Sequence, residues 1–171
     1  YNQGLAKAKV RDLSGAVTSL SQSLKYNKRN TDARNLLGLI YYQMGEIVAA
    51  LSEWVISVHF QERNNIAADY IQAIQNNPAK LKAANKVIQK YNLALSYMQE
   101  NNADLAIIEL KRVVNMSPTY IRAYQLLGLL YMQRKQYAAA RKVLMRAVKV
   151  DRNNMTTLRY LKEVNRLHGK P

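Results

Sequence analysis

One ten-residue stretch occurs twice in the sequence: LLGLIYYQMG begins at Leu36, and LLGLLYMQRK begins 90 residues later, at Leu126. A shorter step of 34 residues pairs residues of similar size elsewhere: Gly128 with Ala94, Tyr131 with Tyr97, and Gly38 with Gly4. The 90-residue separation therefore corresponds to two periods of 34 residues and one insertion of 22 residues. A fixed period of this length indicates a stack of similar structural units.

The residues that recur with this period have the sizes expected of two packed helices. The first helix carries a large residue, a small one and an aromatic: Leu37-Gly38-Tyr41, Leu93-Ala94-Tyr97 and Leu127-Gly128-Tyr131. The second helix carries a small, a bulky and a small residue, with Val113 as a mild departure: Ala50-Trp54-Ser57, Ala106-Leu110-Val113 and Ala140-Leu144-Ala147. A small residue lets two helices approach closely, and stacking the pairs then builds the core.

This pattern resembles the tetratricopeptide repeat, a helix–turn–helix unit whose copies stack into a right-handed superhelix. The resemblance implies an all-α fold and a single domain over residues 1–171. Its expected parts are a truncated repeat at about 1–30, repeats at 31–64, 87–120 and 121–154, a helical insertion at 65–86 and a capping helix at 155–168. The first repeat is the weakest match, because Lys7 stands where the aromatic belongs.

Start and stop signals predict where the helices lie. Asn30 can cap a helix that runs to Met44, and Gly45 ends it. The next helix is expected from Ile47 to Phe60. The insertion predicts a helix near 66–76, followed by an uninterrupted helix of 22 residues over 79–100, about 33 Å long at 1.5 Å per residue. Asn-Asn at 101–102 and Ser-Pro at 117–118 mark the following boundaries.

The composition argues against catalysis. There is no Cys, the two histidines, His59 and His168, are far apart, and no phosphate loop or nucleophile motif occurs. We therefore expect a non-enzymatic protein with no catalytic residue, no metal and no cofactor. The apolar runs are shorter than a membrane helix requires. Because the chain opens at Tyr1 without a Met, we expect a segment of a longer protein. The absence of Cys fits a reducing compartment, so we expect a location in the cytoplasm or at the cytoplasmic face of a membrane.

The resemblance also implies a binding surface, because the inner groove of this family is lined by the exposed side of each first helix. The corresponding positions are Asn35, Leu39, Tyr42, Gln43, Tyr91, Asn92, Leu95, Met98, Gln99, Arg122, Gln125, Leu129, Met132 and Gln133. Amide side chains can donate to and accept from a peptide backbone, and Leu and Met provide an adaptable apolar floor. We expect an interaction scaffold that binds a peptide or helix of a partner protein, with an acidic group near Arg122. The alternative is that these residues only fill the inner curve.

Positive charge is concentrated at the end of the chain. The formal net charge is +15, and residues 121–171 hold twelve Lys or Arg against two Asp or Glu, which gives +10. Two stripes at helical spacing contain most of these cations: Lys142, Arg146 and Lys149, then Arg159, Lys162 and Arg166. Such stripes can bind nucleic acid or an anionic membrane surface, which is the alternative to a protein partner. They can equally be a solvated face that keeps the protein soluble.

Overall fold

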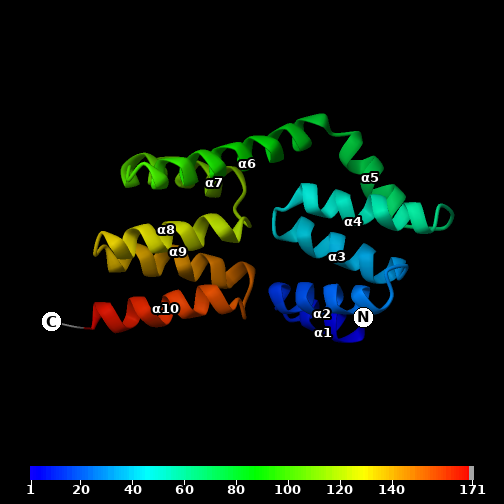
Figure 1. The fold of residues 1–171 in the computed structure, drawn as a ribbon, viewed down its shortest axis with the longest axis horizontal. Coiled ribbons are helices and arrows are strands. Elements are labelled where there is room, and N and C mark those ends of the chain that lie inside the picture. Colours follow the sequence, from blue (N-terminus) through cyan, green and yellow to red (C-terminus); the bar gives the residue numbers. More distant parts are fainter. Residues whose placement is uncertain (170–171) are drawn as a thin grey trace. The chain divides into compact units, whose positions relative to one another are not determined.

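The computed structural model describes residues 1–169, and within that range every regular element is an α-helix (Figure 1). The helices are α1 (Asn2–Lys9), α2 (Leu13–Tyr26), α3 (Thr31–Gln43), α4 (Ile47–Phe60), α5 (Ala67–Gln75), α6 (Pro78–Gln99), α7 (Ala103–Met116), α8 (Ile121–Gln133), α9 (Tyr137–Val150) and α10 (Met155–His168). The predicted all-α class is confirmed, and α4 has the predicted bounds.

Side-chain caps and left-handed turns set the ends of these helices. Asn30 Oδ1 accepts a hydrogen bond from the backbone N–H of Ala33 at 3.0 Å and so caps α3. One residue with positive φ turns the chain inside each of four helical pairs: Arg11, Gly45, Asn101 and Lys135, with φ of 59°, 76°, 57° and 59°. These positions follow the repeat period, so each pair has the same turn although only one turn uses glycine.

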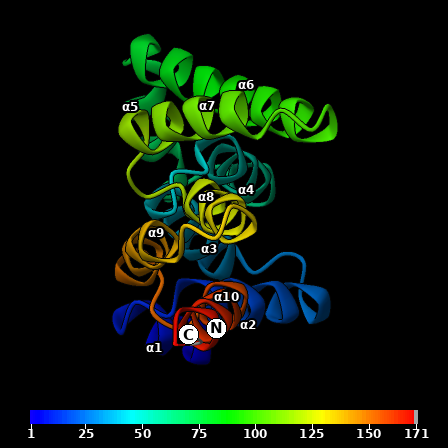
Figure 2. The same ribbon diagram turned by 90° about the vertical axis from the view of Figure 1, so that its left-hand side faces the viewer.

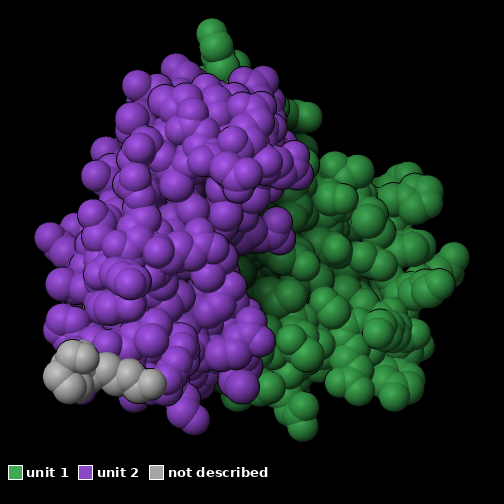
Figure 3. Space-filling view, turned by 60° about the vertical axis from the view of Figure 1, so that its left-hand side comes forward, with its two compact units in different colours: residues 1–84 green, residues 85–171 purple. Residues whose placement is uncertain are grey.

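Residues 1–84 form one compact unit and the residues from 85 onward form another (Figure 3). In the first unit α1 packs on α2, α2 on α3, α3 on α4 and α4 on α5. Trp54 of α4 is 2% exposed and lies in a cluster with Ala50, Ala67 and Ile74. Because Ala67 and Ile74 belong to α5, the start of the expected insertion packs against the preceding repeat.

In the second unit α7 packs on α8, and α9 contacts both α8 and α10 (Figure 2). Leu144 of α9 is fully buried, in a cluster with Ala140, Leu161 and Val164. A Cβ atom placed on Gly128 of α8 would lie 2.7 Å from Leu144 Cγ. The first unit repeats this arrangement, since a Cβ on Gly4 would lie 2.6 Å from Leu20 Cγ. The predicted close approach of paired helices at the small residue is therefore present.

The helices expected around the insertion are both present. α5 covers Ala67–Gln75, and α6 has the predicted length of 22 residues. It begins at Pro78, one residue earlier than predicted, because proline fits the first turn of a helix, where its missing N–H would have no partner. The prediction that the chain forms a single domain stays a prediction.

The large residue of the third repeat differs from its equivalents. Leu37 and Leu127 are 2% and 1% exposed, whereas Leu93 is 40% exposed. α3 and α8 each pack on the preceding helix of their own unit, whereas α6 spans the boundary between the two units at residues 84 and 85. The large residue of the third repeat is therefore more exposed than its equivalents in the other two repeats.

Replacing Gly128 with Val should destabilise the protein, because the added side chain meets the buried Leu144. We expect the free energy of unfolding to fall by about 1–3 kcal/mol, the usual range for overpacking. Lys162→Val is the matched control: Lys162 is exposed at the equivalent position of α10, so its replacement should change stability by less than about 0.5 kcal/mol. Equal changes in urea denaturation would contradict the close-approach model.

Candidate functional site

The residues predicted to line the groove divide into those already bonded within the fold and those left exposed. On α3, Asn35 Nδ2 donates to Asn65 Oδ1 at 2.8 Å, and Asn65 in turn accepts from the backbone N–H of Ala67. Leu39 and Tyr42 are partly buried against the Trp54 cluster. The Nζ of Lys80 lies 4.5 Å from the centre of the Tyr42 ring, a cation–π contact. These α3 positions therefore support the packing of α4, α5 and the start of α6.

The equivalent position of α8 has the same role. Gln125 Nε2 donates to Asn154 Oδ1 and to Thr157 Oγ1, both at 2.9 Å. Asn154 caps α10 by accepting from the backbone N–H of Thr157 at 3.2 Å. On α6 the same position is Tyr91, whose ring makes an edge contact at 5.5 Å with Tyr120, the N-cap residue of α8. In α3, α6 and α8 the same position thus connects to the N-terminus of the next first helix.

The glutamines near the ends of α3, α6 and α8 are exposed: Gln43, Gln99 and Gln133. Asn92, on α6, is also exposed. Within the described part of the chain these four amides have no hydrogen-bond partner. Their donors and acceptors are therefore available to a ligand. The sequence alone could not separate these amides from Asn35 and Gln125, because all six residues lie on the same face of a first helix.

Apolar side chains lie beside the free amides in the second unit. Leu95 and Met98 of α6 and Leu129 and Met132 of α8 are all partly buried, and Met132 packs against the Leu144 cluster. Arg122, at the first turn of α8, is exposed and also interacts within the fold. The first helices of this unit therefore combine half-buried apolar residues with exposed amides and a cation, which suits an extended chain with apolar and polar groups.

The predicted basic residues are separated by the structure into three environments. Lys142, Arg146 and Lys149 of α9 line one hollow, together with Arg141 and His168, which the sequence reading had not placed there. Arg159 and Lys162 of α10 line a second hollow. Arg166 donates from Nε to Glu163 Oε2 at 2.9 Å, and this hydrogen bond and the carboxylate charge raise the pKa of Arg166. Arg141 lies four residues before Met145 and eight residues before Lys149. This helical spacing could have identified Arg141 as part of the same surface.

Two further findings concern the described residues only. Among residues 1–169 no three His, Cys, Asp or Glu side chains come together in a way that could hold a metal ion. None of the helices in that range has both the length and the apolar character needed to cross a membrane.

Comparison with protein families agrees with the internal period. Residues 1–55 and residues 91–163 each match a family model described as the tetratricopeptide repeat. Together the two matches cover more than half of the chain and include all four first-helix small residues, Gly4, Gly38, Ala94 and Gly128. The chain belongs to the tetratricopeptide repeat family. Proteins of this family are generally non-catalytic scaffolds for protein–protein interaction.

The solved structures that match this tetratricopeptide repeat chain have low sequence identity to it. MamA is 17% identical with a TM-score of 0.47, over 98% of this chain and 80% of that chain. The first TPR of Spaghetti (RPAP3) bound to HSP90 peptide SRMEEVD is 14% identical with a TM-score of 0.47, over 82% and 96%. A tetratricopeptide repeat protein from Parabacteroides merdae is 16% identical with a TM-score of 0.47, over 98% and 58%. No curated protein matches the sequence.

Replacing Gln125 with Ala should weaken the attachment of α10, because two hydrogen bonds at its N-terminus are lost. We expect the free energy of unfolding to fall by about 1–2 kcal/mol. Gln133→Ala serves as the control in the same helix, since that amide is exposed and unbonded, and it should change stability by less than about 0.5 kcal/mol. The comparison is made by urea denaturation monitored by circular dichroism. A Gln125→Ala protein as stable as Gln133→Ala would show that the junction does not depend on this amide.

Proposed function

We propose that the protein is a non-enzymatic scaffold that binds a peptide or helix of a partner protein along the first helices of its repeats. The observation that carries this proposal is the set of exposed amides, Gln43, Gln99 and Gln133, at the same position of three first helices. These exposed amides make no hydrogen bond that would stabilise the repeats. The same residue type recurring at one position is what recognition of a regular peptide backbone requires.

The neighbouring apolar residues support this function. Leu95 and Leu129 lie four residues before Gln99 and Gln133, so each pair shares a helix face, and both leucines are only partly buried. Burial of their remaining apolar surface by a ligand would contribute about 25 cal/mol per Å². The amides would form hydrogen bonds with the backbone of the bound segment and so fix its orientation, while its side chains contact the leucines and methionines. We expect Arg122, which is exposed at the first turn of α8, to contact an acidic side chain or a C-terminal carboxylate of the ligand.

The exposure of several predicted groove residues argues against the alternative that all of them only fill the inner curve of the stack. A filling role suits Asn35, Tyr42 and Gln125, whose side chains bond or pack within the fold. It does not account for Gln99 and Gln133, whose amides remain exposed beside partly buried Leu and Met residues.

Binding can be tested with a ligand selected from a library of displayed peptides, so that no partner has to be known in advance. The dissociation constant of the selected peptide is then measured for the wild type and for a variant carrying Asn92→Ala, Gln99→Ala and Gln133→Ala. Three lost hydrogen bonds of about 0.5–1.5 kcal/mol each should weaken binding by roughly 10-fold to 1,000-fold.

The control removes three amides that are exposed and unbonded but lie elsewhere, through Gln22→Ala, Gln72→Ala and Asn115→Ala. This variant should bind the peptide as the wild type does. Equal affinity for the wild type and the first-helix variant, or failure of the library to give any binder, would refute the proposed site.

A further inference from the structure

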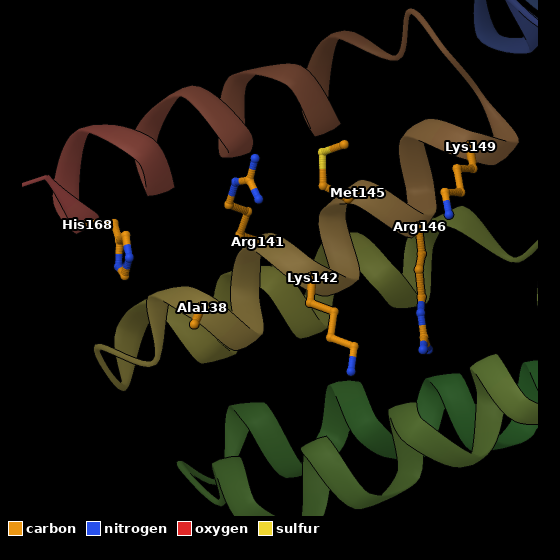
Figure 4. Close-up of a pocket in the computed structure, with 7 residues that line it drawn as sticks. All are labelled: Ala138, Arg141, Lys142, Met145, Arg146, Lys149 and His168. Atoms are coloured by element: carbon orange, nitrogen blue, oxygen red, sulfur yellow. The ribbon is translucent and has the colours of Figure 1, made fainter.

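A strongly basic hollow lies along α9. Its volume is about 570 Å³, and it is lined by Ala138, Arg141, Lys142, Met145, Arg146, Lys149 and His168 (Figure 4). Four of the lining residues are Lys or Arg, and none is Asp or Glu. The six α9 residues recur every three or four positions, which places them on one face of the helix. A cluster of cations without a carboxylate lining favours an anionic ligand.

The side chains that line the hollow extend from two sides of α9. Lys142 and Arg146 extend to one side of α9, whereas Arg141 and Met145 extend to the other side (Figure 4). Met145 is 39% exposed. The cations from Arg141 to Lys149 span eight residues, which is about 12 Å along the helix axis. The surface therefore offers positive charge over a short distance with an exposed apolar group among the cations.

The next helix repeats this combination. A second hollow of about 420 Å³ on α10 is lined by Met155, Thr156, Leu158, Arg159 and Lys162. Met155 is 79% exposed and Leu158 is 39% exposed. Exposed apolar side chains that cluster and are rimmed by polar residues mark contact surfaces, and here Met155 and Leu158 line one hollow together with Arg159 and Lys162. Two neighbouring helices of the second unit thus have the same pairing of exposed apolar and cationic side chains.

We propose that α9 and α10 dock on an anionic lipid surface, with the Lys and Arg side chains meeting lipid phosphates and carboxylates and the exposed Met and Leu side chains entering the interface. Basic residues attract a protein to anionic headgroups, and exposed apolar residues add binding energy that salt does not screen. Non-specific binding of single-stranded nucleic acid uses aromatic side chains for base stacking, and none of the residues lining either hollow is Phe, Tyr or Trp. An acidic protein segment is the remaining alternative, and the competition experiment below distinguishes it from lipid.

Docking on lipid is independent of the peptide site proposed above, because the residues that carry it lie on α9 and α10. The two proposals can therefore fail separately. The Asn92→Ala, Gln99→Ala, Gln133→Ala variant should bind vesicles as the wild type does.

The test measures partition of the full chain onto vesicles of phosphatidylcholine with about a third of phosphatidylserine, and onto vesicles of phosphatidylcholine alone. A variant carrying Arg141→Gln, Lys142→Gln and Arg146→Gln should lose roughly 100-fold in partition onto the anionic vesicles, because each cation near such a surface contributes about 1 kcal/mol. A control that removes three exposed cations of the first unit, through Lys25→Gln, Lys28→Gln and Arg63→Gln, should lose less than about 3-fold. Circular dichroism verifies that helicity is unchanged.

A second pair of variants tests insertion. Met145→Gln and Met155→Gln together should reduce, by several-fold, the fraction of protein that stays bound to anionic vesicles at high salt. Failure of the wild type to bind anionic vesicles, or equal losses for the two charge variants, would overturn the proposal. So would binding to a single-stranded oligonucleotide or to an acidic peptide that is stronger than binding to the vesicles at the same ionic strength.

Discussion

The close approach of two helices at one small residue is the contact on which each repeat depends. Gly128 faces Leu144, Gly38 faces Trp54 and Gly4 faces Leu20, so a missing side chain on one helix makes room for a large side chain on the other. Leu20 and Leu144 are fully buried, and Trp54 is 2% exposed. Because interiors are close-packed, neither member of such a pair can change size without disturbing the other.

A second contact then links one helical pair to the next pair, and different types of side chain make this contact at different junctions. A pair of amides connects α3 to the start of α5, two aromatic rings connect α6 to α8, and a glutamine connects α8 to the cap of α10. Since this junction occupies the residue three positions before the small residue, that position is not available to a ligand. The exposed positions that remain lie nearer the C-terminal end of each first helix, where Gln43, Gln99 and Gln133 are found. In the proposed binding site, packing and ligand binding would therefore use different turns of the same helix.

The sequence predicted most of the fold because its period encodes these local contacts directly. Gly45 at a turn, Asn30 at a cap and the small residues at helix crossings each have one structural role that can be inferred from residue type. The role of Asn35 could not be inferred in this way, since it depends on the position of Asn65, which lies 30 residues later in the chain. The ion pairs Arg34–Glu53 at 2.7 Å and Lys90–Glu109 at 3.2 Å join equivalent positions of two repeats. They could have been found by comparing residues 56 positions apart, which is one period plus the insertion.

The last helix differs from the other first helices at the position that matters most for stacking. α10 resembles α8, with Leu161 in the core where α8 has Leu127, but it has Lys162 where α8 has Gly128. A lysine there excludes a second helix at the distance that Gly128 allows, so any segment that packs on this face must stay farther away. The same residue lines the hollow beside Met155 and Leu158. One substitution therefore both prevents close stacking on α10 and adds a positive charge to a face that would otherwise be apolar.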